Sequence, residues 1–167
     1  LKPSELAVQS ALLVAKLALE AGLPPGVLNV VPGTGAQVGK ALAEHMDVDM
    51  LTFTGSSRVG KLMLQYSGTS NMKVVMAECG GKSPHIGFAD GLYIDRAAGL
   101  IAYMILMNQG QVCSVGSRVL VQESIEERLV EKIVEGLGSI VPGDPQNPAT
   151  RFGPLASARQ LEVVQSF

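Results

Sequence analysis

The sequence predicts an α/β fold in which parallel strands alternate with helices, as in a doubly wound, Rossmann-like sheet. Short β-branched or apolar runs, which are typical of buried parallel strands, alternate with longer segments whose apolar residues recur at helical spacing. Glycine-containing turns separate these runs, and the rhythm changes after the glycine pair at residues 80–81. We therefore expect one α/β region over 1–80 and the first part of a second over 81–167.

In the first region, residues 1–3 are expected to end a strand, and Ser4 is expected to cap a helix over 7–22. Gly22 ends that helix, because glycine readily adopts the left-handed backbone of a helix C-terminus. A β-branched run at 27–31 predicts a short buried strand. The remaining elements are expected in the order helix 36–45, strand 50–54, a helix that follows the turn at 55–57 and runs to about residue 66, and strand 72–76.

In the second region, Ser124 and Glu127 have the spacing of a capping box, which predicts a helix from Ser124 to about residue 137. Apolar residues recur through 94–107 and predict a buried helix. Prolines between 141 and 153 indicate a long loop. The other expected elements are strands at 84–88 and 118–122 and a final helical segment at 160–167.

The composition restricts the class of protein. Of the 167 residues, 47% are apolar and 17% are charged, which suits a packed core and argues against disorder. The net charge of -2 comes without a basic stripe, so nucleic acid is not expected as a partner. The longest apolar run, 100–107, is much shorter than the roughly 20 residues that cross a bilayer, so no membrane association is expected.

The cysteines and histidines indicate the compartment. Two cysteines without disulfide-type spacing, and a start without a secretory signal pattern, predict a cytoplasmic protein. His45 and His85 have no partners at metal-ligand spacing, so we expect surface or packing roles for them and no metal site.

Cys113 lies among small and polar residues at a break between two apolar runs, with Gly110 and Gly116 on either side. This setting leaves the sulfur reachable and places backbone N–H groups beside it, and both features favour a nucleophilic thiolate. The alternative is a free thiol in a loop without a role.

Glu78 follows a strand-like run and precedes Cys79 and the glycine pair, which predicts that it lies in a turn. A carboxylate held near a reactive thiol could activate water for the hydrolysis of a thioester. The alternative is a solvated turn residue, because most acidic side chains are simply exposed.

Two glycine turns are candidates for binding phosphate. Gly33, Gly35 and Gly39 resemble the dinucleotide fingerprint, but one residue too many precedes the last glycine. The turn at 55–60 follows a predicted strand and opens a helix, whose positive end and free N–H groups favour an anion. The alternative for both turns is that they need glycine only for shape.

Five stretches of the sequence occur together in one order and with similar separations in the NAD(P)-dependent aldehyde dehydrogenase superfamily, which the whole chain resembles. One departure from that family is Cys79, which stands where leucine is usual. The stretches are KPSE at 2–5, FTGS at 53–56, ECGGKSP at 78–84, GQVC at 110–113, and GDP with GPL between 143 and 155.

The resemblance implies a mechanism. Cys113 would attack an aldehyde, hydride would pass to the nicotinamide, and Glu78 would activate water to release a carboxylic acid. The backbone N–H of Cys113 would help to form an oxyanion hole, whose second donor in the family is an upstream asparagine that this chain lacks. Glu78 also favours hydrolysis over transfer of the acyl group to coenzyme A, because the acyl-transferring branch lacks this base.

The resemblance also implies a cofactor site. Lys2 and Glu5 match residues that bind the adenine ribose. Since a carboxylate there would repel a 2′-phosphate, NAD is expected rather than NADP. The other positions matched to the cofactor are Gly35 and Gly39 beside the adenine, Gly55 and Ser56 at the pyrophosphate, and Phe53, Thr54, Val59, Cys79 and Gly80.

By the same resemblance, the chain is a central part of a longer protein, with 1–80 belonging to the NAD-binding domain and 81–167 beginning the catalytic domain. The full-length protein is expected to be a homodimer or homotetramer. Residues 70–73 and 80–84 are similar to those of dehydrogenases acting on ω-amino or γ-glutamylamino aldehydes. The alternative is a truncated, non-catalytic fragment that binds nucleotide weakly or is inert.

Overall fold

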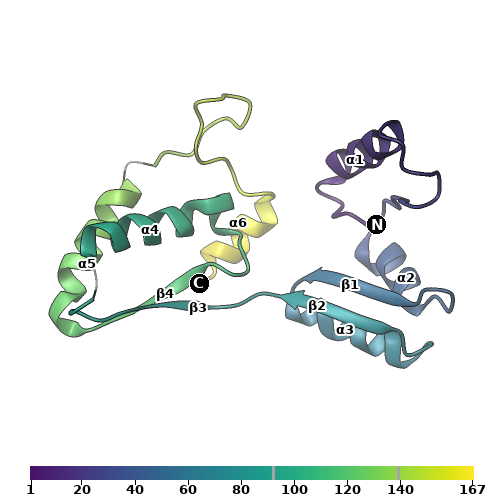
Figure 1. Ribbon diagram of the computed structural model, residues 1–167, viewed down its shortest axis with the longest axis horizontal. Helices are drawn as coiled ribbons and strands as arrows, with labels where there is room; N and C mark the ends of the chain where they lie inside the picture. The colour runs from purple at the N-terminus through teal and green to yellow at the C-terminus, as the bar shows by residue number, and fades with distance from the viewer. Residues whose placement is uncertain (92, 139) are drawn as a thin grey trace. The chain divides into compact units, whose positions relative to one another are not determined.

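The computed structural model describes residues 1–91, 93–138 and 140–167, which form two compact units, Leu1–Cys79 and Gly80–Phe167 (Figure 1). Each unit contains one parallel pair of strands together with helices, so the predicted α/β class is confirmed. The assignment of 1–80 to a cofactor domain and of 81–167 to a catalytic domain stays a prediction. Among the described residues, no helix is both long and apolar enough to cross a membrane.

The first unit is built on β1 (Met50–Gly55) and β2 (Val74–Cys79), which lie side by side in parallel (Figure 1). The crossover between them is α3 (Ser57–Gly68), which contacts both strands. In β1 the half-buried Leu51 and Phe53 alternate with exposed residues, as the two-residue period of a strand requires, whereas in β2 only Val75 and Cys79 are half-buried. Met50 and Met76 are among the exposed residues.

Three helical elements precede β1. They are α1 (Val8–Glu20), the π-helical turn η1 (Gly35–Gly39), and α2 (Lys40–Glu44). The predicted Ser4 cap is wrong, because α1 begins later and no side chain caps it. The Ser4 hydroxyl instead accepts a hydrogen bond from the N–H of Leu6, only two residues onward, in a local turn.

The strand predicted at 27–31 is also wrong, since this segment is irregular. Leu1 donates its N–H to the carbonyl of Asn29, and the N–H of Val31 donates to the carbonyl of Leu1. These two bonds have the pattern of one parallel bridge. A β-branched run becomes a strand only where a neighbouring strand pairs with it, and within the described residues this run has only the one bridge to Leu1.

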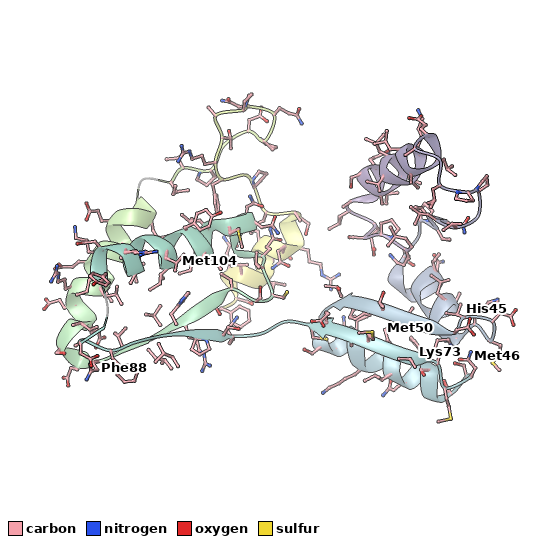
Figure 2. All side chains as sticks on the ribbon, viewed as in Figure 1. His45, Met46, Met50, Lys73, Phe88 and Met104 are labelled. Atoms are coloured by element: carbon pink, nitrogen blue, oxygen red, sulfur yellow. The ribbon has the colours of Figure 1, made fainter. Side chains whose placement is uncertain are left out.

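A buried lysine joins the loops of the first unit. Lys73 is only 6% exposed, and its Nζ donates to the carbonyl of Ala43, in α2, at 2.6 Å. Its own carbonyl accepts from the hydroxyl of Ser67 at 2.6 Å. Nearby, the amide of Asn71 donates to the carbonyl of Met46, and Lys73 lies at the same end of this unit as Met46 (Figure 2). This network ties the loop before β1 to the loop before β2.

The second unit pairs β3 (Ser83–Gly87) with β4 (Gly116–Val121), again in parallel. The crossover contains α4 (Ile94–Leu106) and the short helix η2 (Met107–Gly110). Two helices follow β4: α5 (Glu123–Gly138), which packs along α4, and α6 (Ala158–Gln165). The buried core of this unit consists of Ala98, Ile101 and Leu129.

The capping box predicted at Ser124 is wrong. Because α5 begins at Glu123, Ser124 lies inside its first turn. Glu123 and Glu126 stand in this turn, where negative charge favours the positive end of a helix. Gln122 ends the preceding segment, and its side-chain oxygen accepts from the N–H of Ala89.

Candidate functional site

Cys113 lies in a tight turn directly before β4. The N–H of Val115 donates to the carbonyl of Val112 at 3.3 Å and closes this turn. The Cys113 thiol is free and exposed, whereas the side chain of Val115 is buried and anchors the turn in the second unit. Among residues 1–91, 93–138 and 140–167, none accepts a hydrogen bond from the backbone N–H of Cys113. The turn therefore presents a thiol and an unpaired N–H group from the same residue.

The backbone just before this turn is left-handed over three consecutive residues. Asn108, Gln109 and Gly110 have φ angles of 49°, 56° and 73°, although only glycine adopts such angles without strain. Asn108 and Gln111 stabilise the bend, since each side-chain amide donates to the backbone carbonyl of the other residue. Asn108 lies in η2, directly after the end of α4, and so shapes the loop that leads to Cys113.

The segment that leads into β3 contacts the cysteine turn. A Cβ placed on Gly81 would lie 3.3 Å from the carbonyl oxygen of Cys113, so a larger residue at 81 would press on the turn. Further along, the guanidinium Nε of Arg118 donates to the carbonyl of Lys82 at 2.8 Å. Gly81 is a site residue that the sequence reasoning missed, and its only signal is its place in the glycine pair.

Glu78 lies in β2, one residue before that strand ends, so the turn predicted at this position is wrong. Its backbone is opposite Thr54 of β1, and the pairing continues to Gly55 and Cys79. The neighbouring strand keeps the chain extended up to Cys79, and the glycine pair begins only afterwards. The Glu78 side chain is exposed. Glu78 belongs to the first unit and Cys113 to the second.

The N-terminus of α3 follows the end of β1. The hydroxyl of Ser56, the N-cap residue, accepts from the N–H of Val59 at 3.3 Å. In the part of the chain that the structure describes, the N–H groups of Ser57 and Arg58 find no acceptor. Unpaired N–H groups at the positive end of a helix suit an anion such as phosphate.

Glycines allow α3 to approach the strands closely. A Cβ on Gly60, in α3, would come 2.9 Å from the sulfur of Cys79 in β2. A Cβ on Gly55 would come 2.6 Å from the ring of Phe53, two residues earlier in the same strand. The half-buried thiol of Cys79 thus points toward α3. Gly60 is a second residue that the sequence reasoning missed as part of the site, although it closes the glycine turn noted there.

Lys2, Gly39 and Phe53 line one pocket of about 310 Å³ in the first unit. The Nζ of Lys2 is 3.6 Å from a carboxylate oxygen of Glu5, which brings this predicted pair together. The pKa of Glu5 is below its usual value, first because its carboxylate accepts from its own backbone N–H and second because of the charge of Lys2. Gly35 has open space where a side chain would extend.

One hollow of the second unit contains no predicted site residue. It measures about 550 Å³, is lined mainly by apolar side chains of β3, β4 and α5, and contains neither Cys113 nor a residue matched to the cofactor. Within the described ranges, no group of three or more His, Cys, Asp or Glu side chains is placed to hold a metal ion. Gly80, which was matched to the cofactor, has open space around it.

Comparison with known proteins identifies the family. The model of the aldehyde dehydrogenase family matches residues 1–167. The chain belongs to this family. The sequence is 47% identical over 167 residues to the NADP/NAD-dependent aldehyde dehydrogenase PuuC of Escherichia coli (strain K12), covering 100% of this chain and 34% of PuuC. The predicted resemblance is therefore confirmed.

Solved aldehyde dehydrogenases have the same fold. A crystal structure of an indole-3-acetaldehyde dehydrogenase in complex with NAD+ superposes with a TM-score of 0.95 at 51% identity, covering 99% of this chain and 33% of that one. A γ-glutamyl-γ-aminobutyraldehyde dehydrogenase from Burkholderia cenocepacia gives 0.94 at 47% identity, with the same coverage of 99% and 33%. The chain thus spans about a third of the length of the aldehyde dehydrogenases it matches.

The first unit of this aldehyde dehydrogenase chain fits a dinucleotide in two respects. The α3 N-terminus offers two N–H groups without acceptors in the described residues, as a pyrophosphate requires. The pocket beside Lys2 has both an ammonium group and a neighbouring carboxylate, which suit ribose hydroxyls. These residues would hold the cofactor through its phosphates and one ribose.

Proposed function

We propose that the complete polypeptide containing this chain oxidises an aldehyde to a carboxylic acid with NAD, using Cys113 as nucleophile and Glu78 as base. The observation that carries the proposal is the match of all 167 residues to the aldehyde dehydrogenase family, in a chain whose Cys113 is exposed. Family membership supports aldehyde oxidation in general. The residue roles are specific to the proposal.

The first step forms a bond between the Cys113 sulfur and the aldehyde carbon. The thiolate supplies the electron pair, and the carbonyl oxygen becomes an oxyanion, which the unpaired N–H of Cys113 can stabilise. Bound NAD would supply the acceptor for the hydride that leaves this carbon with its electron pair. Loss of the hydride and re-formation of the carbonyl leave a thioester on Cys113.

The second step hydrolyses the thioester. Glu78 takes a proton from water, the oxygen attacks the acyl carbon, and the carbon–sulfur bond breaks to release the acid and the thiolate. The resemblance supports this role, because the branch of the family that hydrolyses its thioester has this base and the acyl-transferring branch lacks it.

We propose NAD rather than NADP as the cofactor. The carboxylate of Glu5 is exposed, its pKa is below the usual value, and it is charged at neutral pH. At the position that the resemblance assigns to it, this charge would repel a 2′-phosphate. PuuC is named as using either nucleotide, so affinity for both cofactors must be measured.

The test uses protein expressed from its complete reading frame. Fluorescence of NADH is followed after mixing with NAD and an aldehyde, and matched reactions contain indole-3-acetaldehyde or a γ-glutamylamino aldehyde, which the names of solved relatives suggest. We expect faster turnover with the γ-glutamylamino aldehyde. Absence of NADH with every aldehyde would overturn the proposed activity.

Two controls sharpen this test. The 167-residue chain alone is expected to form no NADH, because it lacks the asparagine that the family uses as a second oxyanion donor. Added coenzyme A is expected to leave turnover unchanged; an increase would mean that the acyl group is transferred rather than hydrolysed.

Assembly and location are also proposals. We propose a homodimer or homotetramer in the cytoplasm, for which light scattering after size-exclusion chromatography and a fluorescent fusion are the measurements. A monomer, or a fusion confined to an organelle, would contradict them.

A further inference from the structure

The ring of His85 packs directly on Gly116, the first residue of β4. A Cβ on Gly116 would overlap Nε2 and Cδ2 of this imidazole and come within 2.7 Å of Cε1. His85 comes from β3, where it pairs with Val119. Its ring therefore reaches back along β4 to the point at which that strand begins. No side chain larger than hydrogen fits at 116 without moving either the ring or the strand.

The surroundings of the ring are apolar. His85 lines a cavity of about 140 Å³ whose other walls are aliphatic residues or glycine, drawn from β3, β4, α4 and α5. Its Nε2 is buried and has no hydrogen-bond partner among the described residues. An unpaired buried nitrogen costs stability that an apolar side chain would not, so polar bonding does not explain an imidazole here. Shape is the remaining contribution, and among the described residues no other titratable side chain lines this cavity.

The contact lies at the base of the cysteine turn. Gly116 follows Cys113 by three residues, and the buried Val115 lies between them. The segment containing β3 thus meets this turn at two points: Gly81 beside the Cys113 carbonyl and His85 beneath Gly116. These two contacts, one at the Cys113 carbonyl and one three residues later, restrict where the sulfur and the N–H of Cys113 point.

We propose that His85 is a positioning residue for Cys113 and that it acts through contact of its ring with Gly116. The inference rests on the proposed function in one respect only, the assignment of Cys113 as the nucleophile. It predicts that the shape of residue 85, rather than its charge, controls the reactivity of a thiol that it does not touch.

The test is a double-mutant cycle on Gly116→Ala and His85→Ala in the complete polypeptide. The readout is the rate of Cys113 alkylation by iodoacetamide, measured by mass spectrometry of the Cys113 peptide, with Cys79 in the same digest as an internal reference. We expect Gly116→Ala to slow alkylation of Cys113 about tenfold, because it displaces the turn that presents the sulfur to the reagent. Combining it with His85→Ala should restore the rate to within about twofold of His85→Ala alone, since the overlap is gone.

Gly99→Ala is the matched control. Gly99 lies in α4 of the same unit with nothing within 4 Å of an added Cβ, and alanine there should leave the rate unchanged. A wild-type rate in Gly116→Ala, or a double variant whose loss equals the product of the two single losses, would overturn the proposal.

A second variant keeps the proposal testable if Gly116→Ala does not fold. His85→Phe retains an aromatic ring and removes the unpaired nitrogen, so Cys113 should react at close to the wild-type rate across the pH range, and thermal stability should not fall. If His85→Phe reacts as slowly as His85→Ala, the imidazole nitrogens matter and the proposal fails. The cycle could also show the expected rescue of Cys113 alkylation by His85→Ala while the polypeptide forms no NADH from any aldehyde. That result would overturn the proposed function and leave the positioning role of His85 intact.

Discussion

The two parallel strand pairs place their candidate chemistry at opposite ends. In the first unit, Gly55, Glu78 and Cys79 lie where β1 and β2 end, and the N-terminus of α3 opens directly after β1. In the second, Cys113 lies just before β4 begins. The carboxyl ends of parallel strands lead into helix N-termini, and these N-termini bind anions. The amino end of β4 instead follows the Cys113 turn, whose geometry is set by its contacts with Gly81 and His85.

Glycine has the same use in both units but a different consequence. Gly60 lets α3 approach Cys79, so the contact fixes a helix on a sheet. Gly116 lets His85 approach β4, so the contact fixes the turn that carries the nucleophile. This comparison predicts that a substitution in the first unit acts on cofactor binding and stability, whereas one around Cys113 acts on the chemical step.

The largest effect is expected for Cys113→Ala. Without a nucleophile no thioester forms, and NADH production should fall at least about a thousandfold. Ser114→Ala, at the exposed neighbouring position, is the matched control and should stay within about threefold of wild type, as for a surface substitution. Residual NADH formation above a tenth of the wild-type rate would mean that another residue attacks the aldehyde.

Glu78→Gln is expected to separate the two steps. Thioester formation should still give a burst of NADH, while steady turnover should fall about a hundredfold, because the amide cannot accept a proton from water. Stopped-flow fluorescence measures both phases. Loss of the burst would show that Glu78 acts before hydrolysis. Glu126→Gln, another exposed glutamate, serves as the control.

Lys73→Met is expected to reduce stability and leave the chemistry unchanged. It removes the donor to the buried carbonyl of Ala43, and the free energy of unfolding should fall by about 2 kcal/mol. Urea unfolding measures the loss, with Lys61→Met on the exposed surface of α3 as control. The folded variant should form NADH with the wild-type amplitude in the first turnover. A changed amplitude would mean that Lys73 affects the chemical step as well as stability.

Gly60→Ala is expected to weaken cofactor binding. Its Cβ would lie 2.9 Å from the Cys79 sulfur, so α3 or the Cys79 side chain must shift, which costs about 1–3 kcal/mol in a packed interior. The Kd for NAD should rise, because the shifted helix carries the phosphate-facing N–H groups. Gly68→Ala, with open space around it in the same helix, should not raise that Kd.

The smallest effect is expected for Glu5→Gln, which should narrow the preference for NAD over NADP about fivefold, since one exposed charge is screened by water and salt. Because the pKa of Glu5 is lowered, its carboxylate stays charged to a lower pH than an ordinary glutamate does. The preference should therefore be constant from about pH 8 to pH 5 and decline only at lower pH, as the carboxylate takes up a proton. Fluorescence titrations of both nucleotides at each pH measure it, with Glu20→Gln as control.

Local patterns explain which elements could be predicted. The helical spacing before Gly22 and the glycine turn at Ser56 reflect interactions within a few residues, and α1 and α3 formed where they were expected. The strand at 27–31 and the caps at Ser4 and Ser124 failed. A strand depends on a distant neighbour, and a serine hydroxyl can bond locally in a turn as readily as at a helix end.

The sequence by itself determined the family, the α/β class, and an accessible cysteine in a break between two elements, because each depends on residue type and local spacing. Only the tertiary structure decided that Glu78 lies within a strand, that Cys79 faces Gly60, and that His85 packs beneath Gly116. These are contacts between segments far apart in the chain. Their geometry follows from how strands and helices pack, which no single stretch of sequence specifies.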